Sequence, residues 1–313
     1  MRKILILVIM IVSIVNAKSI DLSKSEGIDQ SIITSLTPKP SDIEVDSNTT
    51  IKATFKEPLN ERFLKRSVTL KKLKVDNSKS FFGFGFGKRS QDENIRGEIN
   101  YDKQINSISF KPKEPLKVGY YEIRYKHLMK KISSKKMMRR DISIKDISYR
   151  FYVPEVVNGY KLPPKPDEKI NNSTLLGIDA NNNGVRDDVE RFIIAQYKDK
   201  HKAVTEIGFQ RARAFQEAIR RNSNALPTDT YLDDAQDCNF YFELDAERFG
   251  DKKLIDHTLS NDFENLILNT KSRVKAYLEY DRQFSGGSYR MTPISEEKSK
   301  CSQEVLELVG GTK

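Results

Sequence analysis

The sequence predicts a multidomain chain of β-then-α class, in which an antiparallel β-sandwich precedes a small C-terminal helical domain with one disulfide. Short segments of alternating apolar and polar residues fill the first half, whereas apolar residues recur every three or four positions in the second half. Between the halves, residues 154–174 contain four prolines. The net charge also changes, from +12 over residues 18–154 to −4 over residues 155–313, which indicates two separate units.

The first 17 residues have the three parts of a secretory signal peptide. Arg2 and Lys3 form a charged head, residues 4–15 form an apolar run, and residues 15–17 (V-N-A) form a small-residue cleavage site. The alternative is an uncleaved membrane anchor, but such a run spans only about 18 Å of a bilayer core of about 30 Å. We therefore expect an exported protein, periplasmic or at the cell surface, whose mature chain has no transmembrane segment.

Residues 18–34 form an N-terminal segment, and the strand-like periodicity begins after it. Segments with this periodicity are residues 50–55, 67–73, 95–101, 107–112, 120–127 and 147–153. Turn formers or charged loops separate them, and residues 102–106 have the composition of a hairpin bend. Six or seven short antiparallel strands in about 120 residues favour a β-sandwich over residues 35–154.

Four motifs follow one another in this half: "TFKEPLN", "SVTL", "SFKPKEPLKVGYYEIRY" and "FYVP". With their order and spacing, residues 35–154 resemble the bacterial Ig-like domain of surface-layer and other envelope proteins. The resemblance implies an Ig-like β-sandwich in an envelope protein, and it implies almost nothing about activity.

Two insertions depart from the pattern of that family. Residues 81–90 (FFGFGFGKRS) interleave four phenylalanines with glycines, and residues 127–140 carry six Lys and Arg. In one interpretation, the aromatic residues 81–86 and the basic residues 130–140 contact an envelope protein, a polysaccharide or an anionic membrane surface. The alternatives are a mobile insertion, phenylalanines folded back on the sandwich, and a solvated charged face. Export disfavours nucleic acid as a partner.

Residues 155–176 are predicted to be an inter-domain linker, because their prolines interrupt helices and central strands. Residues 187–313 then have helical periodicity and predict a small α-domain. Its expected helices cover residues 187–200, 205–222, 231–249, 261–284 and 295–310.

Cys238 and Cys301 are the only cysteines. An even number of cysteines in an exported chain predicts a disulfide, which here would tie the third expected helix to the last. Two free buried thiols are the alternative. Two cysteines are too few for a structural zinc site.

An oxygen-rich loop, residues 177–190 (GIDANNNGVRDDVE), joins the linker to the helices. With Asp179 as position 1, the loop matches the calcium-binding pattern D-x-[DN]-x-[DN]-G with Glu at position 12. Gly184 at position 6 permits the sharp bend that a Cβ would oppose. The predicted Ca²⁺ ligands are the side chains of Asp179, Asn181, Asn183, Asp187 and Glu190 and the backbone carbonyl of Val185.

A complete EF-hand has a helix on each side of its loop, whereas residues 161–178 predict no helix before this one. The segment therefore resembles the single-helix calcium loops of dockerin and thrombospondin type 3 repeats, which implies a structural role for the ion. The alternative is a metal-free Asx turn whose acids favour the N-terminus of the following helix.

Catalytic motifs are absent from the sequence. There is no H-E-x-x-H, G-x-S-x-G or phosphate-loop pattern, and His127, His201 and His257 lie far apart. We therefore expect no catalytic residues, and we expect an exported calcium-binding structural or binding module of the bacterial envelope. The alternatives are an envelope hydrolase with an Ig-like targeting arm, and an adaptor that contacts the membrane surface through residues 81–86 and 130–140.

Overall fold

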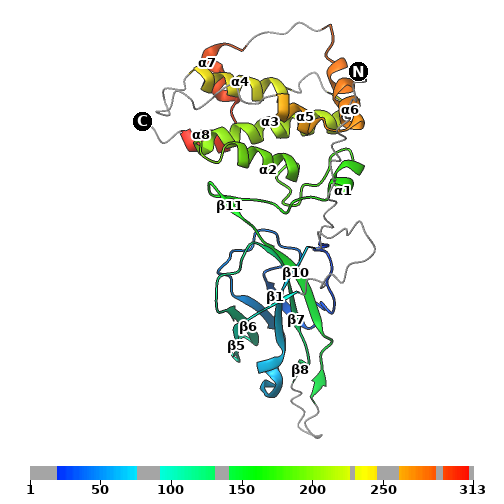
Figure 1. The fold of residues 1–313 in the computed structure, drawn as a ribbon, viewed down its shortest axis with the longest axis vertical. Coiled ribbons are helices and arrows are strands. Elements are labelled where there is room, and N and C mark those ends of the chain that lie inside the picture. The colour runs from blue at the N-terminus through cyan, green and yellow to red at the C-terminus, as the bar shows by residue number, and fades with distance from the viewer. Residues whose placement is uncertain are drawn as a thin grey trace, which may run out of the picture.

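Strands and helices occupy opposite ends of an elongated molecule in the computed structural model (Figure 1). The structure describes residues 20–75, 92–130, 141–225, 230–244, 261–286 and 292–309. The predicted signal peptide (1–17), the aromatic insertion (81–90) and residues 131–140 of the basic cluster lie outside the described residues. The antiparallel strands come first and the helices follow, as predicted.

Two four-stranded antiparallel sheets form the first half, with strand orders β1-β2-β6-β5 and β10-β7-β3-β4. The first sheet consists of β1 (Ile33–Thr37), β2 (Ile51–Phe55), β5 (Gly97–Asp102) and β6 (Ser107–Pro112). The second consists of β3 (Val68–Leu73), β4 (Glu93–Ile95), β7 (Gly119–Tyr125) and β10 (Ile147–Val153). A 3-10 helix, η1 (Glu61–Arg66), precedes β3, and β8 (Met129–Lys130) pairs with β9 (Ile142–Ser143).

Alternation along the strands builds one hydrophobic core from both sheets. Ile51, Ala53 and Phe55 of β2 are buried, whereas Lys52 between them is exposed. Their side chains belong to the same buried cluster as those of the second sheet, which include Ile123 of β7. A strand that buries only one of its faces has this period of two.

The predicted hairpin is formed, because β5 and β6 pair from Gly97–Pro112 to Asp102–Ser107. The single strand expected over residues 95–101 was wrong: β4 pairs with β3 in one sheet, and β5 pairs with β6 in the other. Gly97 lies at the break, where a Cβ would stand 2.4 Å from Cζ of Phe110. A bare Cα at this position lets the chain pass over the Phe110 ring as it changes sheets.

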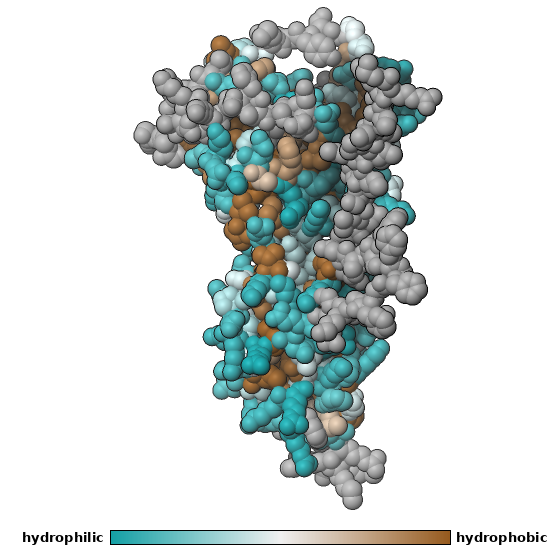
Figure 2. Space-filling view, viewed as in Figure 1, coloured by the Kyte–Doolittle hydropathy of each residue, from teal (hydrophilic) through white to brown (hydrophobic). Residues whose placement is uncertain are grey.

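The predicted linker contains a short helix, which corrects the expectation that residues 161–178 hold no helix before the loop. Strands β11 (Val156–Val157) and β12 (Tyr160–Lys161) form a hairpin, and α1 (Glu168–Ser173) follows. The prolines at 163, 164 and 166 fall between β12 and α1, so they interrupt neither element. Asp167 caps α1 by accepting a hydrogen bond from Ile170 N at 3.0 Å. Apolar surface gathers along the middle of the visible face, at the junction of the two halves (Figure 2).

The helical half is organised around the long helix α3 (Lys202–Arg221). The other elements are α2 (Asp187–Gln196), α4 (Tyr231–Leu244), α5 (Asn261–Ile267), α6 (Lys271–Arg282), α7 (Ile294–Glu297), η3 (Lys298–Lys300) and α8 (Gln303–Val309). Helix α3 contacts α2, α4, α6 and α8. Ile193 of α2, Phe215 of α3 and Phe263 of α5 share one buried cluster, as the helical periodicity of their segments predicts.

Two of the expected helices were wrong in extent, because each is broken. Residues 261–284 form α5 and α6 with a break at 268–270, where Thr270 caps α6 by accepting from Arg273 N at 3.3 Å. Residues 295–310 break at Cys301, whose φ of −71° and ψ of 145° are extended. A capping residue and an extended residue each end helical hydrogen bonding without changing the apolar periodicity.

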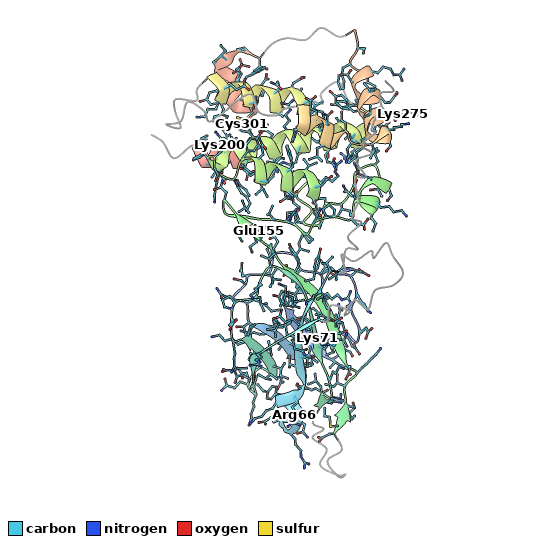
Figure 3. The ribbon with its side chains drawn as sticks, in the orientation of Figure 1. Arg66, Lys71, Glu155, Lys200, Lys275 and Cys301 are labelled. Atoms are coloured by element: carbon cyan, nitrogen blue, oxygen red, sulfur yellow. A yellow bond between two sulfur atoms is a disulfide. The ribbon has the colours of Figure 1, made fainter. Side chains whose placement is uncertain are left out.

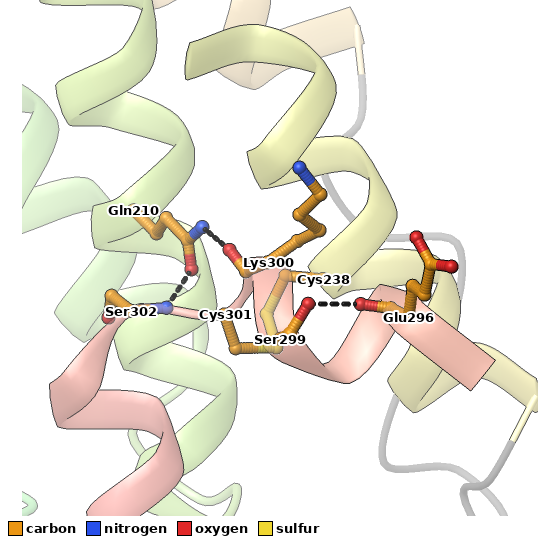
Figure 4. Close-up of a disulfide and its surroundings, with 7 residues drawn as sticks. All are labelled: Gln210, Cys238, Glu296, Ser299, Lys300, Cys301 and Ser302. Carbon is orange, nitrogen blue, oxygen red and sulfur yellow. Dashed lines mark hydrogen bonds between the residues drawn. A yellow bond between two sulfur atoms is a disulfide. The ribbon is translucent and has the colours of Figure 1, made fainter. Parts of the chain in front are cut away.

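The predicted disulfide between Cys238 and Cys301 is present, and it joins α4 to the end of η3 (Figure 4). Both cysteines are buried. Gln210 of α3 holds the chain on either side of Cys301: its Nε2 donates to Lys300 O at 2.8 Å, and its Oε1 accepts from Ser302 N at 2.9 Å. The bridge and Gln210 together fix α7, η3 and α8 against α3 and α4.

Removing the bridge is expected to lower the free energy of unfolding of the helical half by about 3 kcal/mol, because the unfolded chain gains conformational freedom. The double variant Cys238→Ala/Cys301→Ala is compared with the oxidised wild-type protein by urea unfolding, followed by far-UV circular dichroism. Reduced wild-type protein is the control and should show a similar loss. A variant that unfolds at the same urea concentration as the oxidised protein would contradict the prediction.

Across the described ranges, no helix has both the length and the apolar character needed to cross a membrane.

Candidate metal centre

The oxygen-rich loop (residues 177–190) leads into the first turn of α2, and its twelve calcium-pattern positions run from Asp179 to Glu190. Its two ends are joined by hydrogen bonds. Asp187 N donates to Ile178 O at 2.8 Å, and Asp187 Oδ1 accepts from Ala180 N at 2.9 Å. The start of α2 is therefore fixed to the start of the loop.

Side-chain oxygens turn the loop inward at its first, third and fifth positions. The Asp179 carboxylate accepts from Asn183 N at 3.2 Å and from Gly184 N at 2.9 Å. Asn181 Oδ1 accepts from Asn183 N at 3.3 Å, and Asn183 Oδ1 accepts from Val185 N at 2.8 Å. These are Asx-type turns, in which a short polar side chain bonds the backbone a few residues later.

The bend depends on two residues with left-handed backbone conformation. Gly184 has a φ of 83° and Asn182 a φ of 56°. Glycine and asparagine adopt this region at little cost, unlike most residues. A Cβ on Gly184 would also stand 3.3 Å from Cγ of Arg213 on α3, so glycine lets the loop lie close to that helix.

Glu190 is a buried carboxylate, with 4% of its surface exposed. Asn181 Nδ2 donates to its two oxygens at 3.3 Å and 3.2 Å, which brings positions 3 and 12 of the loop together. Burial raises the pKa of Glu190 to about 7, although hydrogen bonds from Asn183 and Asn181 oppose the rise. The negative charges of Asp179 and Glu44 raise this pKa further.

Asp187 is buried more completely, with 1% of its surface exposed. Burial raises the pKa of Asp187 to about 7 against the opposing hydrogen bond from Ala180 N, and the negative charges of Glu190 and Asp179 add to the rise. Neither Asp187 nor Glu190 forms an ion pair with a described Lys or Arg. Two carboxylates in the first turn of α2 are thus buried without a cation from the described chain, which is costly when both are charged.

This donor set fits a hard divalent cation, because a dication would relieve the repulsion between the buried carboxylates. The acids do not suffice alone: the described residues contain no group of three or more His, Cys, Asp and Glu that could hold a metal ion. Ligation would therefore also need the amide oxygens of Asn181 and Asn183 and the carbonyl of Val185. In particular, Asn181 would have to present its oxygen where its Nδ2 now faces Glu190.

Arg186 and Asp188, at positions 8 and 10 of the loop, were not predicted to have a role. The Arg186 side chain is fully buried, and it donates to Ile267 O at 3.1 Å and to Leu266 O at 2.6 Å at the end of α5. Asp188 pairs with Arg186 at 2.5 Å and accepts from Asn171 Nδ2 of α1 at 3.0 Å. The loop thereby connects α2 to both α5 and α1.

Arg273 of α6 is a second buried arginine, with 0% of its surface exposed. Its guanidinium donates hydrogen bonds to backbone oxygens at the end of α1. It donates to the backbone oxygens of Leu175, Asn171 and Thr174 at 2.9, 2.6 and 3.2 Å. It also donates to the side-chain oxygens of Asn172 and Asn269. Burial lowers the pKa of Arg273 to about 10, and the positive charge of Arg186 lowers it further.

Two basic residues that flank the loop in sequence, Lys161 and Arg191, link the strand half and the segment after it to the helices. Lys161 of β12 donates to Glu44 O at 2.7 Å and pairs with Asp46 at 3.1 Å. Arg191 of α2 donates to Pro163 O at 2.6 Å, and its charge opposes the rise that burial causes in the pKa of Tyr152 on β10. Glu155 marks this junction in Figure 3. Helix α2 is thus positioned by groups from both halves.

The two described histidines lie in different halves of the protein. His127 follows β7 in the strand half, whereas His201 caps α3 by accepting from Ala203 N at 3.2 Å. His257 lies outside the described residues.

No protein-family model and no curated protein matches this chain. Among solved structures, it is similar to PcoC, a methionine-rich copper resistance protein from Escherichia coli, with 16% identity and a TM-score of 0.25. That match covers 39% of this chain and 95% of PcoC. A second match, to the S-layer protein rSbsC, has 11% identity and a TM-score of 0.22, and it covers 37% of this chain and 14% of that one.

Proposed function

We propose that this protein is an exported, non-catalytic calcium-binding module of the bacterial envelope, in which an Ig-like β-sandwich is joined to a helical domain braced by Ca²⁺. The observation that carries the proposal is the pair of buried carboxylates, Asp187 and Glu190, which have no cationic partner in the described chain. They lie within a loop that has the spacing of a calcium site. Bound calcium would supply the positive charge that these carboxylates lack.

Calcium would brace the helical domain because residues of the loop form hydrogen bonds to other helices. Asp187 and Glu190 lie in the first turn of α2, and Arg186 and Asp188 beside them bond the ends of α5 and α1. An ion that fixes the first turn of α2 therefore also fixes these contacts. This coupling supports a structural role for calcium, because the ion would stabilise the contacts of α2 with α1 and with α5, which lies about 65 residues further along the chain.

One feature supports an exported setting, in which a weak calcium site would be occupied. The Cys238–Cys301 disulfide is of the kind that persists in oxidising compartments. In extracellular modules, calcium sites bind with Kd values as weak as about 10⁻⁴–10⁻³ M, which suffices where calcium is millimolar.

Calorimetry with and without calcium tests the proposal. At a Kd of about 0.1 mM, 10 mM Ca²⁺ should stabilise the folded protein by about 2.7 kcal/mol, which raises the melting temperature of the helical half by several degrees. The same concentration of Mg²⁺ should raise it less, since Mg²⁺ needs a more regular geometry and gives up its water reluctantly. Equal melting temperatures in calcium and in EGTA would contradict the proposal.

The variant Glu190→Gln distinguishes a loss of calcium binding from a loss of folding. The variant removes a buried charge, so at pH 8 its metal-free form should be at least as stable as the metal-free wild-type protein, while its response to calcium is lost. Asp199→Asn is the matched control: Asp199 is an exposed acid that follows α2, and this variant should respond to calcium as the wild-type protein does. A Glu190→Gln variant that keeps the full calcium response would exclude Glu190 as a ligand.

A further inference from the structure

A charged cleft of about 380 Å³ lies on the strand half, beside β3 and β4. Six charged side chains line it: Lys72, Glu93, Arg96, Lys113, Glu114 and Lys117. Leu116 and Tyr121 also line the cleft, and both are buried. The cleft therefore carries four positive and two negative groups over an apolar and aromatic base.

None of these six charged side chains has an ion-pair or hydrogen-bond partner among the described residues. Elsewhere on the same half, opposite charges do meet. Arg124 pairs with Glu122 at 2.5 Å, and Lys103 pairs with Glu61 at 3.1 Å. Within the described part of the chain, the charges that line the cleft thus have no partner that a ligand would need to displace.

The backbone that carries these side chains is held in place. Lys113 N donates to Arg96 O at 3.0 Å, and Leu116 N donates to Ser47 O at 2.7 Å. The hydroxyl of Tyr121 donates to Lys117 O at 2.6 Å. Three hydrogen bonds therefore fix the backbone of the 113–117 segment, so that a ligand would need to order side chains but not the chain that carries them.

The side chain of Lys72, which lines the cleft, passes close to the Cα of Gly119. A Cβ on Gly119 would stand 2.7 Å from Cε of Lys72, so the bare Cα of Gly119 leaves room for the lysine stem. Burial raises the pKa of Tyr121 to about 12, and the negative charge of Glu93 raises it further. The Tyr121 hydroxyl therefore stays protonated at neutral pH and keeps its hydrogen bond to Lys117 O.

We propose that this cleft binds a sugar that carries a phosphate or carboxylate group. The excess of two positive charges favours an anion, while Glu93, Glu114 and Asn94 can accept hydrogen bonds from hydroxyl groups. A bare polyanion would be repelled by the two carboxylates, whereas an anionic saccharide satisfies both kinds of group. The volume lies within the range of about 300–1,000 Å³ that is usual for small-molecule sites. This site goes beyond the proposed calcium function.

Isothermal titration calorimetry with four defined probes tests the inference. The full chain is titrated with glucose 6-phosphate, glucuronate, glucose and inorganic phosphate. At least one of the two anionic sugars should bind at least tenfold more tightly than glucose and than inorganic phosphate, and comparing the two identifies the anion. No saturable binding of either anionic sugar, or binding no tighter than that of inorganic phosphate, would overturn the proposal.

Charge-reversal variants locate the binding. Lys113→Glu/Lys117→Glu should weaken binding of the anionic sugar at least tenfold, and the fold should survive because backbone atoms and Tyr121 hold this segment. Lys52→Glu/Lys145→Glu is the matched control, since it makes the same change in charge at exposed positions outside the cleft. An equal loss in both variants would show general attraction by a basic protein and would overturn the site.

A third variant tests the role of the two acids. Glu93→Ala/Glu114→Ala, which removes both hydrogen-bond acceptors, should tighten the binding of inorganic phosphate and reduce the preference for the anionic sugar over phosphate at least threefold. An unchanged preference would mean that the carboxylates do not contact hydroxyl groups, and it would overturn the saccharide part of the proposal. Melting temperatures of all the variants check that each is folded.

Discussion

The metal-free protein is expected to lose about 5 kcal/mol of its free energy of unfolding between pH 5 and pH 8, because a pKa that differs by one between the folded and unfolded states corresponds to about 1.4 kcal/mol. Asp187 and Glu190 have folded-state pKa values of about 7, above their ordinary values of 3.8 and 4.5. The protonated carboxyl groups stabilise the folded state fully when the pH is below their ordinary pKa values. This stabilisation is lost as the pH rises through about 7. In this window the folded state binds more protons than the unfolded state, so stability falls.

Calcium should abolish most of this loss, since the ion stabilises the charged form of both carboxylates. Urea unfolding of dialysed, metal-free protein at pH 5, 6, 7 and 8 is compared with the same series in 10 mM Ca²⁺. Glu190→Gln should reduce the metal-free loss by about half, because one of the two carboxylates no longer titrates. A metal-free protein whose stability is flat or rises over this range would contradict the prediction.

Arg273→Met is expected to lower the free energy of unfolding by about 4 kcal/mol or more. The guanidinium donates to five oxygen acceptors at the end of α1 and before α6; the bond to Asn171 O is buried and the other four are part-buried. A buried acceptor left without a donor costs about 1–3 kcal/mol, and a part-buried one costs less. Arg273→Lys should restore only part of the loss, because an ammonium has three donors and lacks the planar fork. Urea unfolding followed by circular dichroism measures both variants.

Arg282→Met on the same helix is the matched control. The Arg282 side chain is 73% exposed, and it pairs with Glu279 at 2.7 Å. Exposed pairs of this kind contribute about 0–1 kcal/mol, so this variant should differ from the wild-type protein by less than about 0.5 kcal/mol. Similar losses in the two methionine variants would show that the buried contacts of Arg273 do not determine its effect.

Periodicity predicted the elements that bury one face. Ile51 and Phe55 on a strand and Val189 and Ile193 on a helix follow the period of their element, and all four are buried. The disulfide was predicted because only one pairing of two cysteines exists. The break between β4 and β5 was not predicted, because it depends on which sheet each segment joins, and alternation is the same in both.

The candidate loop could be located from spacing alone, since its pattern is local to 12 residues. The burial of Asp187 and Glu190 could not be predicted, because it depends on helices that pack over the loop. The burial of Arg186 and Arg273 could not be predicted either, because charged residues are expected at the surface. Their acceptors lie far away in the chain: 81 residues separate Arg186 from Ile267, and 98 separate Arg273 from Leu175.

The contacts of Arg273 determine which fragments of the chain can fold by themselves. A fragment that starts at residue 177, where the oxygen-rich loop begins, would omit α1 and leave the guanidinium without the oxygens of residues 171–175. The smallest piece that refolds by itself should therefore reach back at least to Asp167, the cap of α1. Limited proteolysis should accordingly spare the stretch between α1 and the loop.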